Sequence, residues 1–181
     1  MILSKRPDID RFLAQPGEIR AAVIYGRDRG VARERADQLA AKIARDPNDP
    51  FDVAVLTDTD VESDPARLEG ELAALSMMGG RRLVRLRLST EKVGPDRAAA
   101  EALKAHVEGL LNPEAFLLIE AGGLDRTSPL RKAAEAAKGA VCIPCYEDEA
   151  GDVARLVRES LARDKVGLTQ EAMDLFVARL P

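Results

Sequence analysis

The residues whose types and spacing most suggest chemistry lie between Gly26 and Arg33, where the chain has the layout of a phosphate-binding loop. Residues 21 to 25 form an apolar run typical of a buried strand, Gly26 marks a turn, and a helical pattern follows over residues 31 to 43. In a working P-loop, two glycines shape the loop, a lysine contacts the β- and γ-phosphates, and a hydroxyl holds Mg²⁺.

The positions that would contact a nucleotide carry unsuitable residues. Val31 stands where the second glycine belongs, Ala32 where the lysine belongs, and Arg33 where Ser or Thr belongs, although Gly26 and Gly30 remain. Without an ammonium group and a hydroxyl, the loop has no side chain for phosphate or Mg²⁺. We therefore expect a degenerate P-loop with no cofactor, the alternative being an unrelated strand–turn–helix unit.

Two cysteines and one histidine are the other candidates for chemistry. Cys142 and Cys145 form a Cys-x-x-Cys pair that ends an apolar strand, whereas redox pairs normally begin a helix that lowers the thiol pKa. Zinc would need two further ligands, and His106 is far away in sequence. We expect structural cysteines, a histidine that is no ligand, and no metal site.

Glu120 and Asp125 follow an apolar strand and could form a carboxylate pair for acid–base catalysis. No nucleophile or metal partner accompanies them in the sequence, so we expect polar residues at the mouth of a loop.

Composition limits the class of protein. The chain has 181 residues, of which 46% are hydrophobic and 32% are charged, so we expect a soluble globular protein. No segment is apolar enough for a membrane helix, which predicts a cytoplasmic location and no membrane partner. A net charge of −4 and only six aromatic residues (four Phe and two Tyr) confine any DNA contact to a local patch.

The order of elements predicts an α/β fold with a five-stranded parallel sheet and flanking helices. We expect the first strand to lie in the centre of the sheet, and a helix near residues 7 to 14 to pack beside it. The expected strands are residues 21–25, 51–57, 82–88, 115–121 and 139–144, and the expected helices between them are about 31–45, 65–75, 96–111 and 128–138.

The pattern changes after Tyr146. An acidic link over residues 147 to 151 precedes an apolar helical pattern over 152 to 163 and a second helix that begins near Thr169. Two apolar helices without a third suggest the beginning of an all-α domain. We therefore expect domains at 1–146 and 147–181, with the chain a fragment of a longer protein.

Another candidate site lies before the third strand. The predicted helix carrying Leu68, Leu72 and Leu75 on one face runs into Met77 and Met78, and the two glycines that follow should end it. Methionine serves as core filler and also on surfaces that insert into an apolar groove, and both alternatives remain open here. At a helix end we expect one or both methionines to be exposed.

Taken together, these motifs resemble the delta subunit of the bacterial DNA polymerase III clamp loader, over its N-terminal AAA+ domain and the start of its lid. The resemblance rests on the order and spacing of the degenerate P-loop, Ser76-Met77-Met78-Gly79-Gly80-Arg81-Arg82-Leu83-Val84, Leu124-Asp125-Arg126-Thr127-Ser128, and Ile143-Pro144-Cys145-Tyr146-Glu147.

The resemblance implies a subunit that binds and opens the sliding clamp (the beta subunit) for loading onto primed DNA during replication, without hydrolysing ATP. It implies gamma/tau and delta prime subunits as further partners within the polymerase III holoenzyme, a DNA-directed DNA polymerase and nucleotidyltransferase. In that family an exposed apolar pair, matching Met77 and Met78, inserts into a pocket on the clamp. The pair is often Leu-Phe, so an aromatic anchor is missing here. The flanking residues would be Ser76, Gly79, Gly80 and Arg81.

The third strand also bears on catalysis, because Arg85 and Arg87 stand where an active AAA+ ATPase has acidic residues. They either reach the edge of the sheet or pair with carboxylates, and DNA contact by Arg81, Arg82, Arg85 and Arg87 is an alternative. We expect no intrinsic catalysis. The competing functions are a divergent P-loop ATPase that uses Arg29 or Arg33, and a thiol redox module.

Overall fold

The computed structural model describes residues 1–76, 79–89, 92–145, 157–158, 161–162, 166–177 and 179. The chain divides into two compact units, Met1–Cys145 and Tyr146–Pro181, and each is described on its own. The first unit contains the sheet and the residues considered for chemistry.

The sheet has five parallel strands in the order β2-β3-β4-β1-β5, which confirms the predicted fold class. The expectation that β1 is central is wrong, because β1 lies between β4 and β5 and the middle strand is β4. Both strands are almost fully buried, so apolar pattern alone does not distinguish them. The strands are β1 (Ala21–Gly26), β2 (Val53–Thr57), β3 (Arg82–Leu88), β4 (Ala115–Ala121) and β5 (Ala140–Cys145).

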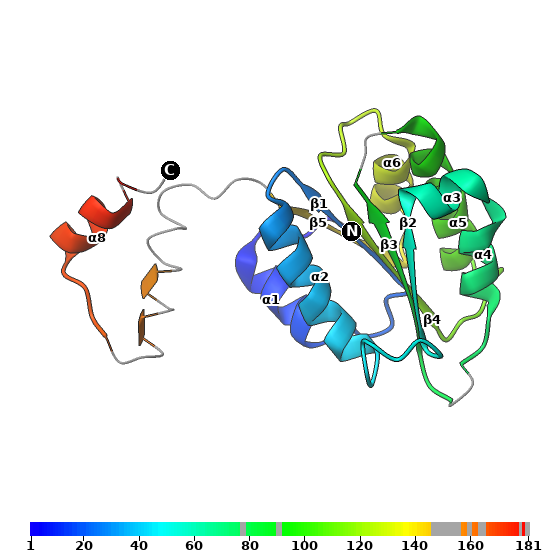
Figure 1. Ribbon diagram of the computed structural model, residues 1–181, viewed down its shortest axis with the longest axis horizontal. Coiled ribbons are helices and arrows are strands. Elements are labelled where there is room, and N and C mark those ends of the chain that lie inside the picture. Colours follow the sequence, from blue (N-terminus) through cyan, green and yellow to red (C-terminus); the bar gives the residue numbers. More distant parts are fainter. Residues whose placement is uncertain are drawn as a thin grey trace. The chain divides into compact units, whose positions relative to one another are not determined.

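Helices cover both faces of the sheet (Figure 1). One face packs against α1 (Arg6–Ala14) and α2 (Arg29–Ile43), and the other against α3 (Asp58–Ser63), α4 (Ala66–Ala73), α5 (Val93–Val107) and α6 (Pro129–Ala136). Each face has its own apolar cluster: Val23, Leu86 and Ile119 belong to the α3–α6 side, and Ile24 and Phe116 to the α1–α2 side. Burial on both faces explains the continuous apolar runs of β1, β4 and β5.

The outer edge of β5 is covered by the first residues of the chain. Ile2 pairs in parallel with Cys142, and the backbone N–H of Leu3 donates to the carbonyl oxygen of Cys142 at 2.9 Å. The α-amino group of Met1 donates to the carbonyl oxygen of Ala140 at 2.8 Å. These bonds place residues 1 to 3 beside β5 in the manner of a further short strand.

Two helices differ from the sequence-based expectation. The short helix α3 was not expected, although Thr57 and Asp60 form a capping box at its start. Helix α4 ends at Ala73, so the expectation that it continues to Gly79 and Gly80 is wrong. Asn112 donates two hydrogen bonds to carbonyl oxygens at the end of α4. Its backbone N–H donates to Leu72 at 3.2 Å, and its side-chain Nδ2 donates to Ala74 at 2.8 Å.

The early end of α4 changes the position of Leu75. The helical pattern placed this side chain beside Leu68 and Leu72, which are fully buried, but Leu75 is 75% exposed. The chain has left the helical path by this residue, so the periodicity of α4 no longer applies to it.

In the second unit, α8 (Gln170–Val177) confirms the helix expected after Thr169. The hydroxyl of Thr169 accepts a hydrogen bond from the N–H of Ala172 at 3.3 Å, and Met173 is buried within this unit. Of the helix expected over 152–163, residues 157–158 and 161–162 are helical and the others lie outside the described residues. None of the described helices is long and apolar enough to cross a membrane.

Candidate functional site

The turn after β1 begins at Gly26, which touches the backbone of β5. A Cβ atom on Gly26 would lie 1.7 Å from the carbonyl oxygen of Cys145, so this position accepts no side chain without a shift of the backbone. The glycine that resembles the first P-loop glycine therefore has a packing role between two neighbouring strands.

Helix α2 begins at Arg29, and only Arg27 and Asp28 separate it from β1. The Asp28 Oδ1 atom accepts a hydrogen bond from the N–H of Val31 at 2.9 Å, as a helix N-cap does. In a P-loop, a phosphate occupies the N-terminus of the helix. Here a carboxylate of the chain itself satisfies one of these amides and places negative charge at the same end of the helix.

The other P-loop positions lie inside α2. Gly30 and Val31 belong to its first turn, and Ala32 is only 3% exposed within the cluster between α2 and the sheet. Arg33 is exposed, and its Nε lies 4.0 Å from a carboxylate oxygen of Asp37. The strand, turn and helix are present, but no extended loop connects them.

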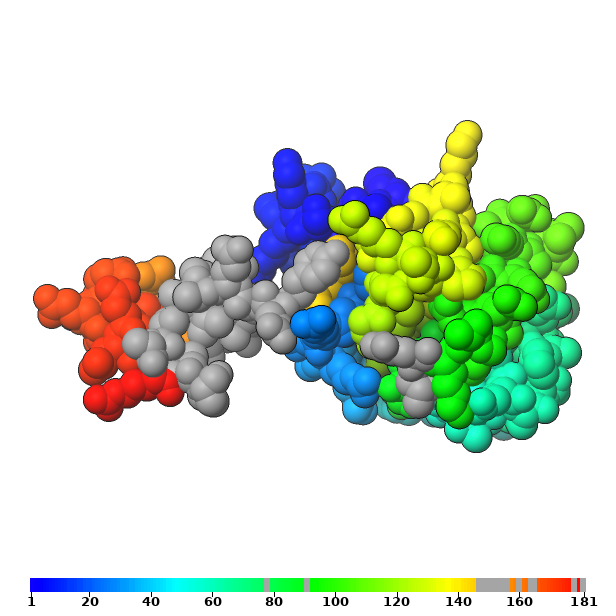
Figure 2. Space-filling model, turned by 90° about the horizontal axis from the view of Figure 1, so that it is seen from above, coloured from blue at the N-terminus to red at the C-terminus, as the bar shows by residue number. Residues whose placement is uncertain are grey.

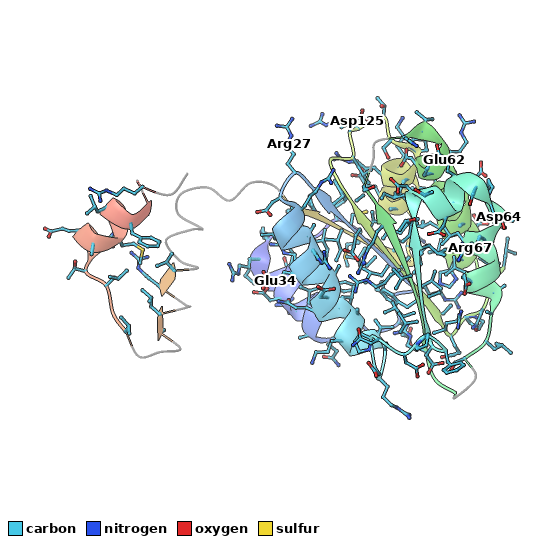
Figure 3. All side chains as sticks on the ribbon, in the orientation of Figure 1. Arg27, Glu34, Glu62, Asp64, Arg67 and Asp125 are labelled. Carbon is cyan, nitrogen blue, oxygen red and sulfur yellow. The ribbon has the colours of Figure 1, made fainter. Side chains whose placement is uncertain are left out.

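A small cavity of about 150 Å³ lies beside this turn, lined among others by Arg29, Arg33, Arg87, Glu120 and Gly122. Ligand pockets typically have volumes of roughly 300 to 1,000 Å³, so the cavity is too small for a nucleotide. Arg27 and Asp125, which follow β1 and β4, lie at the same end of the sheet (Figure 3).

The question left open for Arg85 is resolved by ion pairs. Its guanidinium donates to Glu120 on β4, with Nε at 2.9 Å from Oε1, and to Asp37 on α2 at 2.7 Å. The Arg85 side chain is 7% exposed and that of Glu120 12% exposed. Arg87 is also near Glu120, with Nε 3.5 Å from Oε1, and is 40% exposed. The charged groups on the α2 side of β3 thus compensate one another.

Arg82 is likewise held by the protein. It is buried, donates to the carbonyl oxygen of Phe51 at 2.7 Å and to that of Glu71 at 3.2 Å, and forms an ion pair with the Glu71 carboxylate. Arg82 and Arg85 are thus buried and bound within the protein, which does not favour a contact with a DNA phosphate.

Glu120 and Asp125, considered as an alternative pair for acid–base catalysis, have separate partners. Glu120 is bound to arginines, whereas Asp125 accepts hydrogen bonds from the backbone N–H groups of Thr127 at 2.6 Å and Ser128 at 3.0 Å. The hydrogen bond from the Thr127 hydroxyl, followed by that from its N–H, lowers the pKa of Asp125. These contacts stabilise a loop and an ionised carboxylate.

The thiols and the histidine are buried. Cys142 and Cys145 are both buried, and burial raises the pKa of Cys142 to about 11. His106 is fully buried with its Nε2 3.1 Å from the carbonyl oxygen of Ala115, and burial lowers its pKa. No group of three potential metal ligands occurs among the described residues. A raised thiol pKa is opposite to what a redox Cys-x-x-Cys pair requires.

The segment from Ser76 to Arg81 is anchored at both ends. At one end, the hydroxyl of Ser76 donates to Asp52 Oδ1 at 2.5 Å. At the other end, Arg81 donates to the carbonyl oxygens of Ile19 at 2.9 Å and Gly17 at 3.4 Å, and its guanidinium lies 5.4 Å from the centre of the Phe116 ring. Both anchors fix this short connection to the body of the first unit.

Between the anchors, Gly79 and Gly80 have φ angles of 75° and 111°, which side chains rarely adopt. Neither has another atom within 4 Å of an added Cβ, so this backbone faces open space. Met77 and Met78 lie outside the described residues, and their exposure remains a prediction.

Sequence reasoning missed the partners that hold these residues. Asp37 lies on α2, whereas Asp52 and Asn112 lie in connections before β2 and β4, and their pairing depends on the strand order. In the sequence, the one sign of such a partner was a polar residue directly before an apolar strand, as Asp52 is. A cluster of three lysines, on α5, on α6 and in the turn after α6, also went unnoticed, because Lys104 is distant in sequence from Lys132 and Lys138.

No family model matches the chain, and no curated protein matches it significantly. Among solved structures, the chain is similar to the Bacillus subtilis DNA clamp loader delta protein, with a TM-score of 0.66 and 19% sequence identity over 94% of this chain and 51% of that chain. It shares the fold of that delta protein. The chain thus spans about half the length of that protein.

A second solved structure, a DNA polymerase III gamma subunit-related protein from Thermotoga maritima, has a TM-score of 0.48 and 15% identity over 84% of this chain and 49% of that chain.

Proposed function

We propose that this chain is the N-terminal part of a clamp-loader delta subunit, with a degenerate AAA+ domain followed by the start of a lid. It binds and opens the sliding clamp for loading onto primed DNA during replication, in a complex with gamma/tau and delta prime subunits. The observation that carries this proposal is the likeness to the Bacillus subtilis delta protein over 94% of the chain. The short anchored connection before β3 supports it.

The proposed contact with the clamp is the segment from Ser76 to Arg81. Its anchors at Asp52 and Phe116 limit the freedom of the connection, which lowers the entropy lost when it binds. The two glycines allow a tight turn beside Met77 and Met78. An apolar pair presented from a fixed base can enter a preformed pocket and dominate an interface.

The proposal includes no ATP binding and no catalysis by this chain. Asp28 caps α2 where a phosphate would bind, Ala32 is buried where a lysine would be needed, and the nearby cavity is small. These features do not favour the alternative of a divergent ATPase. Calorimetric titration with Mg-ATP should give no heat of binding, and a micromolar dissociation constant would restore that alternative.

Clamp binding is tested by surface plasmon resonance with the sliding clamp of the same organism. Changing Met77 and Met78 together to Ala should weaken binding by about a hundredfold or more, because burial of two methionines contributes several factors of ten in affinity. The matched control is Leu175→Ala with Phe176→Ala, which removes a different adjacent apolar pair that is exposed.

The control pair should bind the clamp as tightly as the parent chain. Equal weakening by both pairs would contradict a specific contact at Met77 and Met78. Loss of the thermal unfolding transition in the Met77 and Met78 variant would assign these residues to the core instead.

A further inference from the structure

A groove between α5 and α6 forms a second candidate surface, separate from the segment Ser76–Arg81. The two helices lie side by side on the same face of the sheet, where Figure 2 shows yellow residues of α6 next to green residues of α5. The groove has a volume of about 630 Å³. This size is within the range of roughly 300 to 1,000 Å³ that is usual for ligand pockets.

The floor of the groove consists of short apolar side chains. Ala133 and Ala136 line it from α6, Ala137 lines it directly after the end of that helix, and Val107 lines it from α5. Ala133 and Ala136 have the spacing i, i+3, so they share one face of the helix. Short side chains along such a face allow another helix to approach closely and to pack its ridge into the groove.

The rim is positively charged. Lys104, Lys132 and Lys138 line the groove and are exposed, and among the described lining residues Glu108 is the one carboxylate. In the part of the chain that the structure describes, none of these three lysines forms an ion pair. Elsewhere the exposed cation Lys92 is paired with Glu62 at 2.7 Å. Lys132 is still close enough to Asp125 to help lower the pKa of that carboxyl. Three lysines around one groove nevertheless contrast with the net charge of −4 of the whole chain.

The positive rim and the apolar floor of the groove together indicate which kind of molecule would bind there. Nucleic acid would match the lysines, but recognition of unpaired bases uses aromatic or arginine side chains for stacking, and the described lining has neither. An apolar floor between lysines instead complements a helix with an apolar ridge and acidic flanks. We propose that the α5–α6 groove binds an acidic amphipathic helix of a partner protein.

The proposal can be tested with a defined probe. The probe is a synthetic, fluorescently labelled helical peptide with Ala and Leu along one face and Glu on both flanks, and its twin has Lys in place of every Glu. Fluorescence anisotropy with the full chain should show binding of the acidic peptide and not of its twin. The affinity should fall as salt concentration rises, because exposed charges are screened.

Three variants separate the contributions of charge and shape. Lys132→Glu with Lys138→Glu should weaken binding by roughly tenfold or more, because two attractive contacts become repulsive. Lys5→Glu with Lys42→Glu, the same charge change at exposed lysines elsewhere, should leave the affinity unchanged. Ala136→Arg adds a positive charge but fills the groove, so it should weaken binding as well.

Several results would overturn the proposal. If Ala136→Arg bound the acidic peptide as tightly as the parent chain or more tightly, the binding would come from a general attraction between charges and not from the shape of the groove. Labelled single-stranded or duplex DNA bound more tightly than the peptide, through the same lysines, would assign the groove to nucleic acid. Absence of peptide binding by the folded parent chain would also refute it. The neutral double variant Lys132→Gln with Lys138→Gln tests the contribution of the two lysines to peptide affinity without reversing their charge. None of these variants alters the segment proposed to bind the clamp, so the two proposals are tested separately.

Discussion

Glu120 provides the sharpest test of whether the charged cluster on β3 and β4 is structural. Glu120→Gln keeps the shape of the side chain and removes its charge. The change leaves Arg85, which is 7% exposed, with Asp37 as its remaining carboxylate partner, and Asp37 is 54% exposed. When the carboxylate of Glu120 loses its charge, few water molecules can reach the Arg85 guanidinium to solvate it instead.

The magnitude follows from burial. Removing one partner of a buried ion pair costs about 3 to 5 kcal/mol of unfolding free energy. Because Asp37 retains its bond to Arg85 at 2.7 Å, we expect a value near the lower end, about 3 kcal/mol. Asp37→Asn removes the more exposed partner and should cost about 1 kcal/mol or less.

Urea unfolding followed by circular dichroism measures both changes in unfolding free energy. The slope of this free energy against urea concentration should be the same for each variant, which shows that they share a comparable unfolded state. Replacing Arg85 and Glu120 together by Leu should recover much of the stability lost in Glu120→Gln, because no charge then remains buried. Equal destabilisation by Glu120→Gln and Asp37→Asn would refute the reasoning, since it depends on the difference in burial.

Two further predictions concern titratable groups. Burial lowers the pKa of His106, so the unfolded chain binds a proton more readily than the folded chain; the unfolding free energy should fall as the pH drops below the ordinary value of 6.5. His106→Gln should remove this slope, and the same pH dependence in both proteins would exclude His106 as its cause. Cys142 is fully buried with its pKa raised to about 11, so native protein should react with a thiol reagent only as fast as it opens. Rapid modification of both cysteines at neutral pH would contradict this.

Much of the fold could be predicted because buried strands and helices require apolar residues in recognisable patterns. The apolar runs gave the bounds of β3 and β4 as the structure has them, and the limits of α2 and α6 within two residues. The degenerate character of the β1–α2 turn could also be read directly, because a P-loop requires specific residues at fixed positions. The position of β1 in the sheet could not, because β1 and β4 are equally apolar.

The rest depends on contacts between residues distant in sequence. No glycine or proline marks the end of α4, which coincides with hydrogen bonds from Asn112, 38 residues after Ala74. The pairing of Arg85 with Asp37 and Glu120 likewise requires α2, β3 and β4 to be in place. The positions of Ser76 and Arg81, at the two ends of their segment, also depend on contacts with Asp52 and with Gly17 and Ile19.

The edges of the sheet limit how copies of this chain can associate. Residues 1 to 3 lie beside β5 and leave only a very short outer edge there, which is a poor template for another strand, whereas no described strand lies beside β2, the strand at the opposite edge. An exposed edge can accept a strand from another molecule, and continuous growth through sheets requires two such edges. With one open edge, β2 can pair with β2 of a second copy about a two-fold axis, and the combined sheet then closes. Addition of strands at this sheet therefore leads to a finite pair of molecules rather than to a fibre.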